Sequence, residues 1–443
     1  MDVHERRFLM WRILSAASAA GAGLVGCQPD AMVHAPLLTP QAARVRPEPK
    51  PPTEHPEEMP ATVPVPVVRP VRALVVEGAG QFRVSIDGPY VVLDDQGRVV
   101  ARGADLPWTL VRASSGVLLG TQRVGSRSAR LVPERPDSIQ ISTLGNTGAW
   151  SPSLRFDGQL HCLADGARVS AINVVPIDSY LAGVIPRECY PSWHLETFRA
   201  QAVAARTYAL YEMARTGNEP FDVRATTASQ VYGGVPAGEP GRRAQQAVES
   251  TRGIVLTWTT PAGERIFPTF FSAACGGMTQ DAGNCKPIKA VPPLTGGVPC
   301  DYCQIAGEKA YRWGPLRLSK AEITTKLAQR YPAMASLGRV ERIEALSQTS
   351  FGRNVRLRVF GSRGASFDIQ AEDFRLAIGP TRLKSTDCRI VSEKDAIVFS
   401  DGRGYGHAMG MCQWGAQGQA LEGRRAGQIL LTYYPGANLT RVY

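Results

Sequence analysis

The segment from residue 192 to residue 215 constrains the fold more than any other part of this sequence, because it carries an unbroken helical pattern. Ser192 is placed to cap a helix N-terminus, and Glu196 lies in the first turn, where a negative charge favours the helix dipole. The apolar residues recur at steps of three and four, and they are Leu195, Phe198, Ala202, Ala205 and Ala209. The segment therefore predicts a long helix with one apolar face against a core.

Other elements follow from shorter patterns. Alternating apolar runs at 82–86, 90–93 and 99–101 are typical of strands, and Asp94-Asp95-Gln96-Gly97 is a hairpin-turn signal between two of them. We therefore expect a small β-rich module over 73–150. Further helices are expected at 240–251, 318–331, 371–378 and 412–434, and strands at 253–259, 265–272, 338–346, 354–360 and 395–399. This mixed order predicts an α+β fold.

The N-terminus has the organisation of an export signal. Arg6, Arg7 and Arg12 form a basic region, and residues 13–26 form an apolar run without charge that is short for a membrane span. The run ends in Leu24-Val25-Gly26-Cys27, which resembles a bacterial lipobox. We predict that residues 1–26 are a signal peptide and that Cys27 is acylated. The alternative is ordinary signal cleavage near this point.

Residues 27–72 are rich in proline and cannot bury a core. They predict an extended tether between the lipid and the folded part, so that the protein lies in the cell envelope, anchored to a membrane by its lipid. The formal net charge of +11 suits an anionic polymer or a membrane surface. Export and the lack of a basic-aromatic motif argue against nucleic acid as a partner.

Four motifs in the second half of the chain follow one another in a fixed order. They are VVPIDSYLAGVIPRE at 174–188 leading into LETFRAQAVAARTYAL at 195–210, SQVYGG at 229–234, GYGHAMGMCQWGA at 404–416 and YYPG at 433–436. Together they resemble the SpoIID/LytB family over roughly 150–443. The resemblance implies a glycan-cleaving domain over 151–443, with strands and helices around a glycan-binding groove. It implies either lytic transglycosylase activity on peptidoglycan or enhancement of a peptidoglycan amidase without catalysis.

Glu188 stands at the family's glutamate position. Cleavage of a glycosidic bond needs an acid for the leaving oxygen, and a lytic transglycosylase can use the same carboxyl group to accept the proton of the sugar's own 6-hydroxyl. The sequence suggests that Glu188 lies in a loop between Pro186 and Pro191, beside Tyr190 and Trp193, where an apolar shell keeps it protonated. The alternative is an ordinary surface glutamate.

Several other residues of the motifs are candidates for binding the glycan. Arg199 and Arg206 are seven apart on one helical stripe and are basic positions in the family, so they could hold the lactyl carboxylate of muramic acid or orient Glu188. The alternative is a solvated basic stripe. His407 lies in a glycine-dense loop, and we expect it to contact sugar or to order the loop rather than to bind metal. The remaining candidates could form hydrogen bonds to sugar or stack on it, but each could equally be part of the scaffold: Gln230, Tyr232, Gln413, Trp193 and Trp414.

Eight of the nine cysteines follow Cys27. Cys189 and Cys412 replace residues that are methionine and serine in the family, and we expect them to form a disulfide. Cys275, Cys285, Cys300 and Cys303 lie close together in the sequence, and in an exported chain two disulfides are favoured. The alternative is structural zinc, because the group ends in C-x-x-C. No other cofactor is expected.

Overall fold

The computed structural model describes residues 60–145, 147–226, 229–288 and 291–443. The predicted signal peptide, Cys27 and most of the predicted tether lie outside these residues. Within the described part of the chain, no helix is both long and apolar enough to cross a membrane. Among the described residues, strands β1 to β13 precede helix α2, and helices and strands then follow in mixed order, which confirms the α+β fold class.

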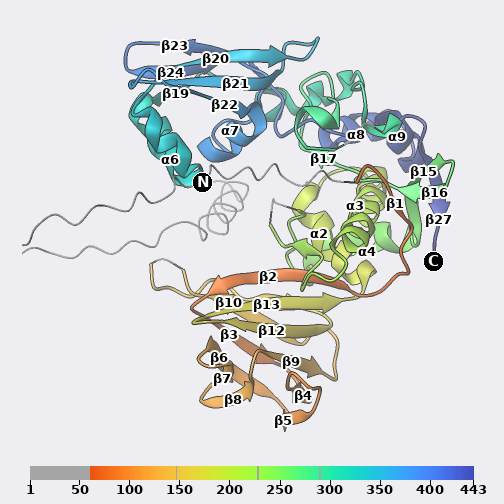
Figure 1. Cartoon of the computed structure of the whole chain (residues 1–443). Coiled ribbons are helices and arrows are strands. Elements are labelled where there is room, and N and C mark those ends of the chain that lie inside the picture. The colour runs from red at the N-terminus through yellow and green to blue at the C-terminus, as the bar shows by residue number, and fades with distance from the viewer. Residues whose placement is uncertain (1–59, 146, 227–228, 289–290) are drawn as a thin grey trace, which may run out of the picture. The chain divides into compact units, whose positions relative to one another are not determined.

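Two sheets pack face to face as a β-sandwich (Figure 1). One sheet has the strand order β14 (Val223–Arg224), β2 (Val71–Ala79), β13 (Arg168–Val175), β12 (Gln159–Asp165), β9 (Ser128–Pro133), β4 (Tyr90–Leu93) and β5 (Val99–Gly103). The other has the order β11 (Leu154–Phe156), β10 (Ile139–Thr143), β3 (Gln81–Ile86), β6 (Leu106–Ala113), β7 (Val117–Leu119) and β8 (Gln122–Gly125). The expected hairpin between β4 and β5 is confirmed. Strands from both sides of residue 150 pair with one another, so the sandwich extends past the boundary expected there.

The chain is already packed onto the fold before residue 72, where the tether was expected to end. β1 (Val63–Pro64) pairs with β16 (Gly263–Ile266), and Arg69 and Arg72 both bind Asp222. The Arg69 Nη1 and Nη2 atoms lie 2.8 and 2.7 Å from the two carboxylate oxygens, which is a bidentate arrangement. The proline-rich composition did not reveal that the described end of this segment, from residue 60 to residue 72, packs against the folded part.

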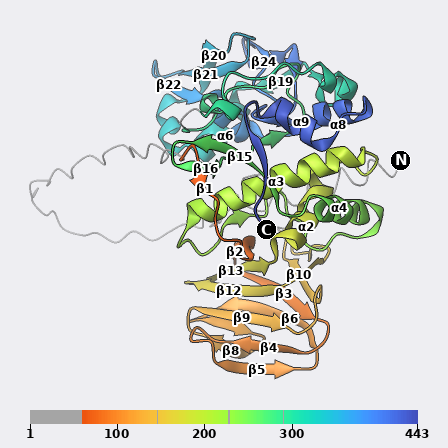
Figure 2. The same ribbon diagram turned by 90° about the vertical axis from the view of Figure 1, so that its right-hand side faces the viewer.

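The predicted long helix is α3 (Leu195–Thr216), which contacts α2 (Ile177–Glu188), α4 (Gly238–Ser250), β15 (Ile254–Thr260), α8 (Gln413–Leu421) and α9 (Ala426–Tyr433) (Figure 2). Its cap is His194, whose Nδ1 accepts from the Glu196 N–H, and not Ser192 as predicted. The expected apolar face, which includes Ala202, Ala205 and Ala209, packs into one core cluster. The opposite face packs into a second cluster, so the helix is buried on two sides rather than one.

The helix α2 was not predicted, and it corrects the placement of Glu188 in a loop. The proline at position 186 suggested an irregular segment, but Pro186 lies inside the last turn of α2, and Glu188 is the final helical residue. The helix forms because the residues from Ile177 to Ile185 are largely buried in the core that α2 shares with α3. Tertiary burial outweighs the local cost of the proline.

The rest of the chain builds smaller sheets and a third core cluster. The helices expected at 240–251, 318–331 and 371–378 are confirmed as α4, α6 (Lys320–Arg330) and α7 (Ala371–Ile378), whereas 412–434 holds two helices, α8 and α9. They are separated near Gly423, whose φ of +86° ends α8. The remaining elements are β17 (Phe271–Ser272), β18 (Arg312–Trp313), β19 (Leu316–Ser319), β20 (Val340–Gln348), β21 (Asn354–Gly361), β22 (Ser366–Gln370), β23 (Arg389–Ser392), β24 (Ala396–Ser400), β25 (Gly402–Arg403), β26 (Met411–Cys412), β27 (Asn438–Arg441), α5 (Gly307–Ala310), η1 (Ala282–Asn284), η2 (Pro292–Leu294), η3 (Asp301–Ala306) and η4 (Pro332–Leu337).

The buried Asp222 should make stability depend on pH. Burial alone would raise its pKa, but the hydrogen bonds from Arg69 and Arg72 outweigh that effect and hold the pKa below its usual value. This stabilisation is therefore complete above the unfolded pKa, about 3.9, and is lost as pH falls toward the lower folded pKa. In urea unfolding at pH 7 we expect Asp222→Asn to cost about 2 kcal/mol.

The matched control is Glu77→Gln on β2, which removes the exposed ion pair with Arg224 and should cost about 0.5 kcal/mol or less. Equal losses in the two variants would show that residues 69–72 are not held by Asp222.

Candidate functional site

Glu188 lies where three motifs meet. It ends α2, and its Oε2 accepts a hydrogen bond of 3.0 Å from Nε2 of Gln413, the first residue of α8. The residue as a whole is half-buried, and its carboxyl group is enclosed by protein. Burial raises the pKa of the Glu188 carboxyl above its ordinary value, and the hydrogen bonds from Gln413 and the backbone of Val231 offset only part of this rise. A carboxyl group with a raised pKa is better suited to donate a proton than an ordinary one.

Gln413 connects Glu188 to the central helix. Its Nε2 also lies 3.3 Å from Oε1 of Gln201, which is fully buried on α3. The Gln201 Nε2 atom has no hydrogen-bond partner among the described residues. Gln201 was not identified from the sequence as a site residue, although it lies inside the family's helix motif. Its buried polar side chain on an alanine-rich helix was the available signal.

An aromatic cluster lies beside the Gln413–Glu188 contact. Trp193 and Trp414 pack edge to face with ring centroids 5.0 Å apart, and Tyr190 packs against both at 5.2 and 5.4 Å. Trp193 is buried, Trp414 is half-buried and Tyr190 is 44% exposed. Tyr190 and Trp414 therefore offer the accessible aromatic surface, and Trp193 supports it from within. The structure brings the two predicted tryptophans together and adds Tyr190.

His407 has a structural hydrogen bond. Its Nδ1 accepts from the Met409 N–H at 3.0 Å, and its backbone oxygen accepts from the Gln280 side chain. Burial lowers the pKa of His407 to about 4, so the ring is neutral at physiological pH. The loop needs glycine at position 410, where φ is +60° and an added Cβ would lie 2.1 Å from the Phe270 oxygen. These contacts support loop ordering, which was one of the two roles expected for His407.

Gln230 and Tyr232 lie inside the protein, which corrects their assignment to the glycan. Gln230 accepts from the Tyr180 hydroxyl at 3.0 Å and donates to the Ala205 oxygen at 3.2 Å. The Tyr232 hydroxyl donates to Asn173 at 2.9 Å. Both residues are less than 5% exposed, so their polar atoms join α2, α3 and β13 rather than facing a ligand.

The two arginines on α3 have different environments. Arg206 is 0% exposed and donates to the backbone oxygens of Val248, Thr251 and Ile254, and it also contacts Asp178 and Tyr443. It is therefore a structural residue that joins α3 to the end of α4 and to β15, not a carboxylate-binding group at the surface. Arg199 is partly exposed and pairs with Glu196 and Ser250. The sequence pattern placed them on one stripe, but packing separates their roles.

The cysteines do not group as predicted. All eight described cysteines are free thiols. The Sγ atoms of Cys275, Cys300, Cys303 and Cys412 lie within 4.8 Å of one another, and all four residues are buried. Cys285, expected in this set, instead accepts from Gln280 at 3.0 Å. Cys412 therefore groups with Cys275, Cys300 and Cys303 and not with Cys189. The reason is the parallel pairing of β17 with β26, which brings Cys412 beside Ser272, three residues before Cys275.

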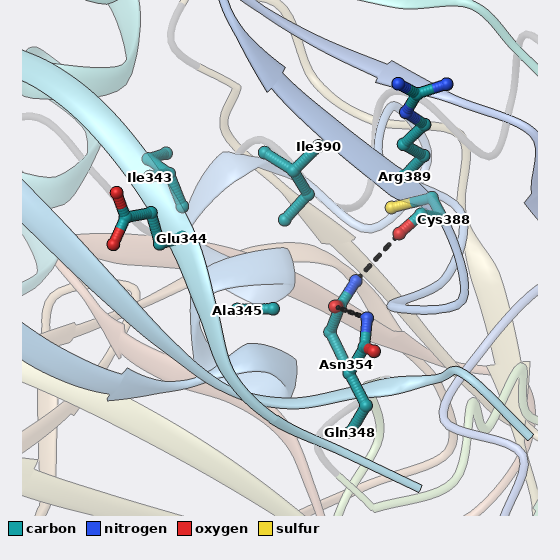
Figure 3. A pocket seen from close by; sticks show the side chains of 8 residues that line it. All are labelled: Ile343, Glu344, Ala345, Gln348, Asn354, Cys388, Arg389 and Ile390. Carbon is teal, nitrogen blue, oxygen red and sulfur yellow. Dashed lines mark hydrogen bonds between the residues drawn. The ribbon is translucent and has the colours of Figure 1, made fainter. Parts of the chain in front are cut away.

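A cavity of about 300 Å³ lies elsewhere in the chain, between β20 and β23 (Figure 3). Asn354 lines it, but its side chain is already bonded to Gln348 and to the backbone oxygens of Thr386 and Cys388. None of the residues that line this cavity belongs to the motifs. The chemistry of the carboxyl group, and not cavity volume, therefore identifies Glu188 and its neighbours as the candidate site.

The chain is similar to one family model and to several known proteins. A family model described as stage II sporulation protein (SpoIID) matches residues 165–258, which include α2, α3 and α4. An uncharacterized protein of Brachyspira hyodysenteriae is 30% identical over 370 residues, covering 83% of this chain and 92% of that protein. The amidase enhancer of Bacillus subtilis is 30% identical over 304 residues, covering 59% of this chain and 40% of its own length. Stage II sporulation protein D of Bacillus subtilis is 25% identical over 287 residues, covering 61% of this chain and 76% of that protein.

The two arginines of α3 allow a matched test of burial. Arg206→Met keeps most of the volume but leaves three backbone oxygens without their donor, so we expect a loss of about 3 kcal/mol in the free energy of unfolding. Arg199→Met removes a partly exposed ion pair with Glu196 and should cost only about 0.5–1 kcal/mol. Urea unfolding of both variants measures the difference. A stable Arg206→Met protein that binds glycan weakly would restore the ligand-binding role predicted from the sequence.

Proposed function

Because this chain belongs to the SpoIID family, we propose that it is a lytic transglycosylase that cleaves the glycan strands of peptidoglycan. The observation that carries the proposal is the environment of Glu188, an enclosed carboxyl group with a raised pKa that lies two residues before Tyr190 of the aromatic cluster. A protonated carboxyl group is the acid that glycosidic cleavage requires.

One carboxyl group is sufficient for the proposed reaction. Protonated Glu188 gives its proton to the glycosidic oxygen, and the bond from that oxygen to the anomeric carbon of muramic acid breaks. The Glu188 carboxylate then takes the proton of the same sugar's 6-hydroxyl, whose oxygen bonds to the anomeric carbon. The products are a free hydroxyl on one strand and an anhydromuramic end on the other, and Glu188 returns to its starting state.

The neighbours of Glu188 have separate roles in this proposal. Gln413 can hold the carboxyl group in one orientation, because its amide N–H donates to Oε2. Tyr190 and Trp414 can stack on the apolar face of a sugar ring, because Tyr190 is exposed, Trp414 is half-buried, and they follow Glu188 and Gln413 closely in the chain. The basic character of the chain favours approach to an anionic wall polymer.

The second candidate function is enhancement of a peptidoglycan amidase without glycan cleavage. The similarity to the Bacillus subtilis amidase enhancer favours it, since this chain is 30% identical to that protein over 304 residues. The same aromatic surface would then bind glycan and present it to an amidase. The two functions differ in their products, because only the transglycosylase generates anhydromuramic ends.

The substitution Glu188→Gln tests the catalytic role. Glutamine keeps the shape and an oxygen that can accept from Gln413, but it cannot donate and recover the proton. We expect glycan binding to remain and turnover to fall by about 10²–10⁴-fold, measured as anhydromuramic ends released from peptidoglycan with and without its peptide stems. In the wild type, the rate should fall as pH rises through the raised pKa of Glu188.

The control is Glu249→Gln, which changes an exposed carboxylate on α4 and should leave turnover unchanged. A raised folded pKa means that ionised Glu188 reduces stability above that pKa, so Glu188→Gln should be at least as stable as the wild type at pH 7. Wild-type turnover in Glu188→Gln would end the catalytic assignment. A wild-type protein that releases no anhydromuramic ends but accelerates an amidase would establish the enhancer.

We also propose that the protein is anchored in the cell envelope through a lipid on Cys27. Replacing Cys27 by serine removes the acylated thiol, so the protein should move from the membrane fraction to the soluble fraction. The measurement is fractionation of cells followed by immunoblotting, with Cys162→Ser as the matched control, because Cys162 is buried between β9 and β13. Unchanged membrane association of Cys27→Ser would exclude the lipid anchor.

A further inference from the structure

Four cysteine sulfurs converge in the second core cluster. Cys275 follows β17, Cys300 and Cys303 lie at the start of η3, and Cys412 ends β26. Their Sγ atoms all lie within 4.8 Å of one another, and the Cys275 and Cys303 sulfurs are 3.7 Å apart. We propose that these four cysteines bind one structural zinc ion.

The spacing fits one tetrahedral ion. A Zn–S bond of about 2.3 Å in a tetrahedron places neighbouring sulfurs about 3.8 Å apart. The separation of 3.7 Å between Cys275 and Cys303 matches this value. Sulfurs this close cannot surround a multinuclear iron–sulfur cluster, whose larger core would hold them further apart. Four sulfur ligands in a closed, buried site are typical of structural zinc.

The surroundings provide donors that stabilise thiolates. The backbone N–H groups of Cys275 and Gly415 donate to the Cys412 sulfur at 3.2 and 3.3 Å. Cys412 is also the N-cap of α8, where the positive end of the helix dipole favours a thiolate. Arg353, which is only 2% exposed, donates from Nη2 to the Cys275 backbone oxygen at 2.7 Å and so helps to hold that ligand in place. Hydrogen bonds of this kind commonly surround metal ligands.

Disulfides explain the arrangement less well. A disulfide joins two sulfurs about 2 Å apart, and two disulfides do not need to lie next to each other. Here four cysteines from three separate segments share a single centre, and the nearby Cys285 bonds to Gln280 instead. One ion accounts for all four positions at once.

The site has a structural consequence for Glu188. Cys412 directly precedes Gln413, whose amide donates to the Glu188 carboxylate. A metal held by Cys412 would therefore fix the start of α8 to β17 and η3 and so position Gln413. This consequence rests on the proposed function, whereas the binding of zinc does not.

The test is the metal content of the purified full-length protein, measured by inductively coupled plasma mass spectrometry after dialysis without chelator. We expect one zinc per chain, and we expect Cys300→Ser and Cys412→Ser each to lose most of it. Cys285→Ser is the matched control, since it removes a thiol of the same sequence region that lies outside the four-sulfur centre, and it should retain one zinc.

Cobalt substitution covers the case in which the serine variants fail to fold. Wild-type protein loaded with Co²⁺ should show the visible absorption of a tetrahedral cobalt–thiolate centre. Protein without zinc whose intact mass shows disulfides among these cysteines would overturn the proposal, as would iron bound in place of zinc. Zinc-loaded protein that cleaves no glycan would count against the proposed function alone, whereas active protein without zinc would count against the zinc site alone.

Discussion

The burial of α3 on two sides is the constraint on which the rest of the structure depends. Its small side chains let α2 and α4 approach closely on one side, and β15, α8 and α9 on the other. A helix enclosed in this way must satisfy every polar group it carries. Arg206 does so by donating to the backbone at the end of α4 and to β15, and Gln201 does so in part by accepting from Gln413. These contacts fix the positions of the elements around the helix.

The candidate site is a product of that arrangement. α2 ends at Glu188, and α8 begins at Gln413, at the point where both helices meet α3. Burial at this junction raises the pKa of Glu188, and the same junction leaves Tyr190 exposed beside it. The proposed glycan cleavage uses both features, because a raised pKa favours the acid form of Glu188 and an exposed aromatic ring can stack on a sugar.

The four-cysteine centre also contacts the start of α8, where Gln413 lies. Cys412 and Gln413 are neighbours in the chain, but their side chains belong to different assemblies, one with three other sulfurs and the other with Glu188. The start of α8 is therefore held both by the hydrogen bond from the Cys275 N–H to the Cys412 sulfur and by the Gln413 contacts. Gln417 adds a third connection, because its Oε1 accepts from the His194 N–H and the Thr197 hydroxyl at the start of α3.

The sequence by itself determined the α+β class, the long helix, the hairpin between β4 and β5, and the motifs that contain Glu188, Trp193, Gln413 and Trp414. These features depend on local periodicity, turn chemistry or short motifs, all of which can be read along the chain. Only the tertiary structure decided that α2 continues through Pro186, that Gln230, Tyr232 and Arg206 face inward, and that Cys412 rather than Cys285 completes the four-cysteine centre. Each of these depends on contacts between residues far apart in the sequence, since burial and pairing are properties of the packed fold and not of any single segment.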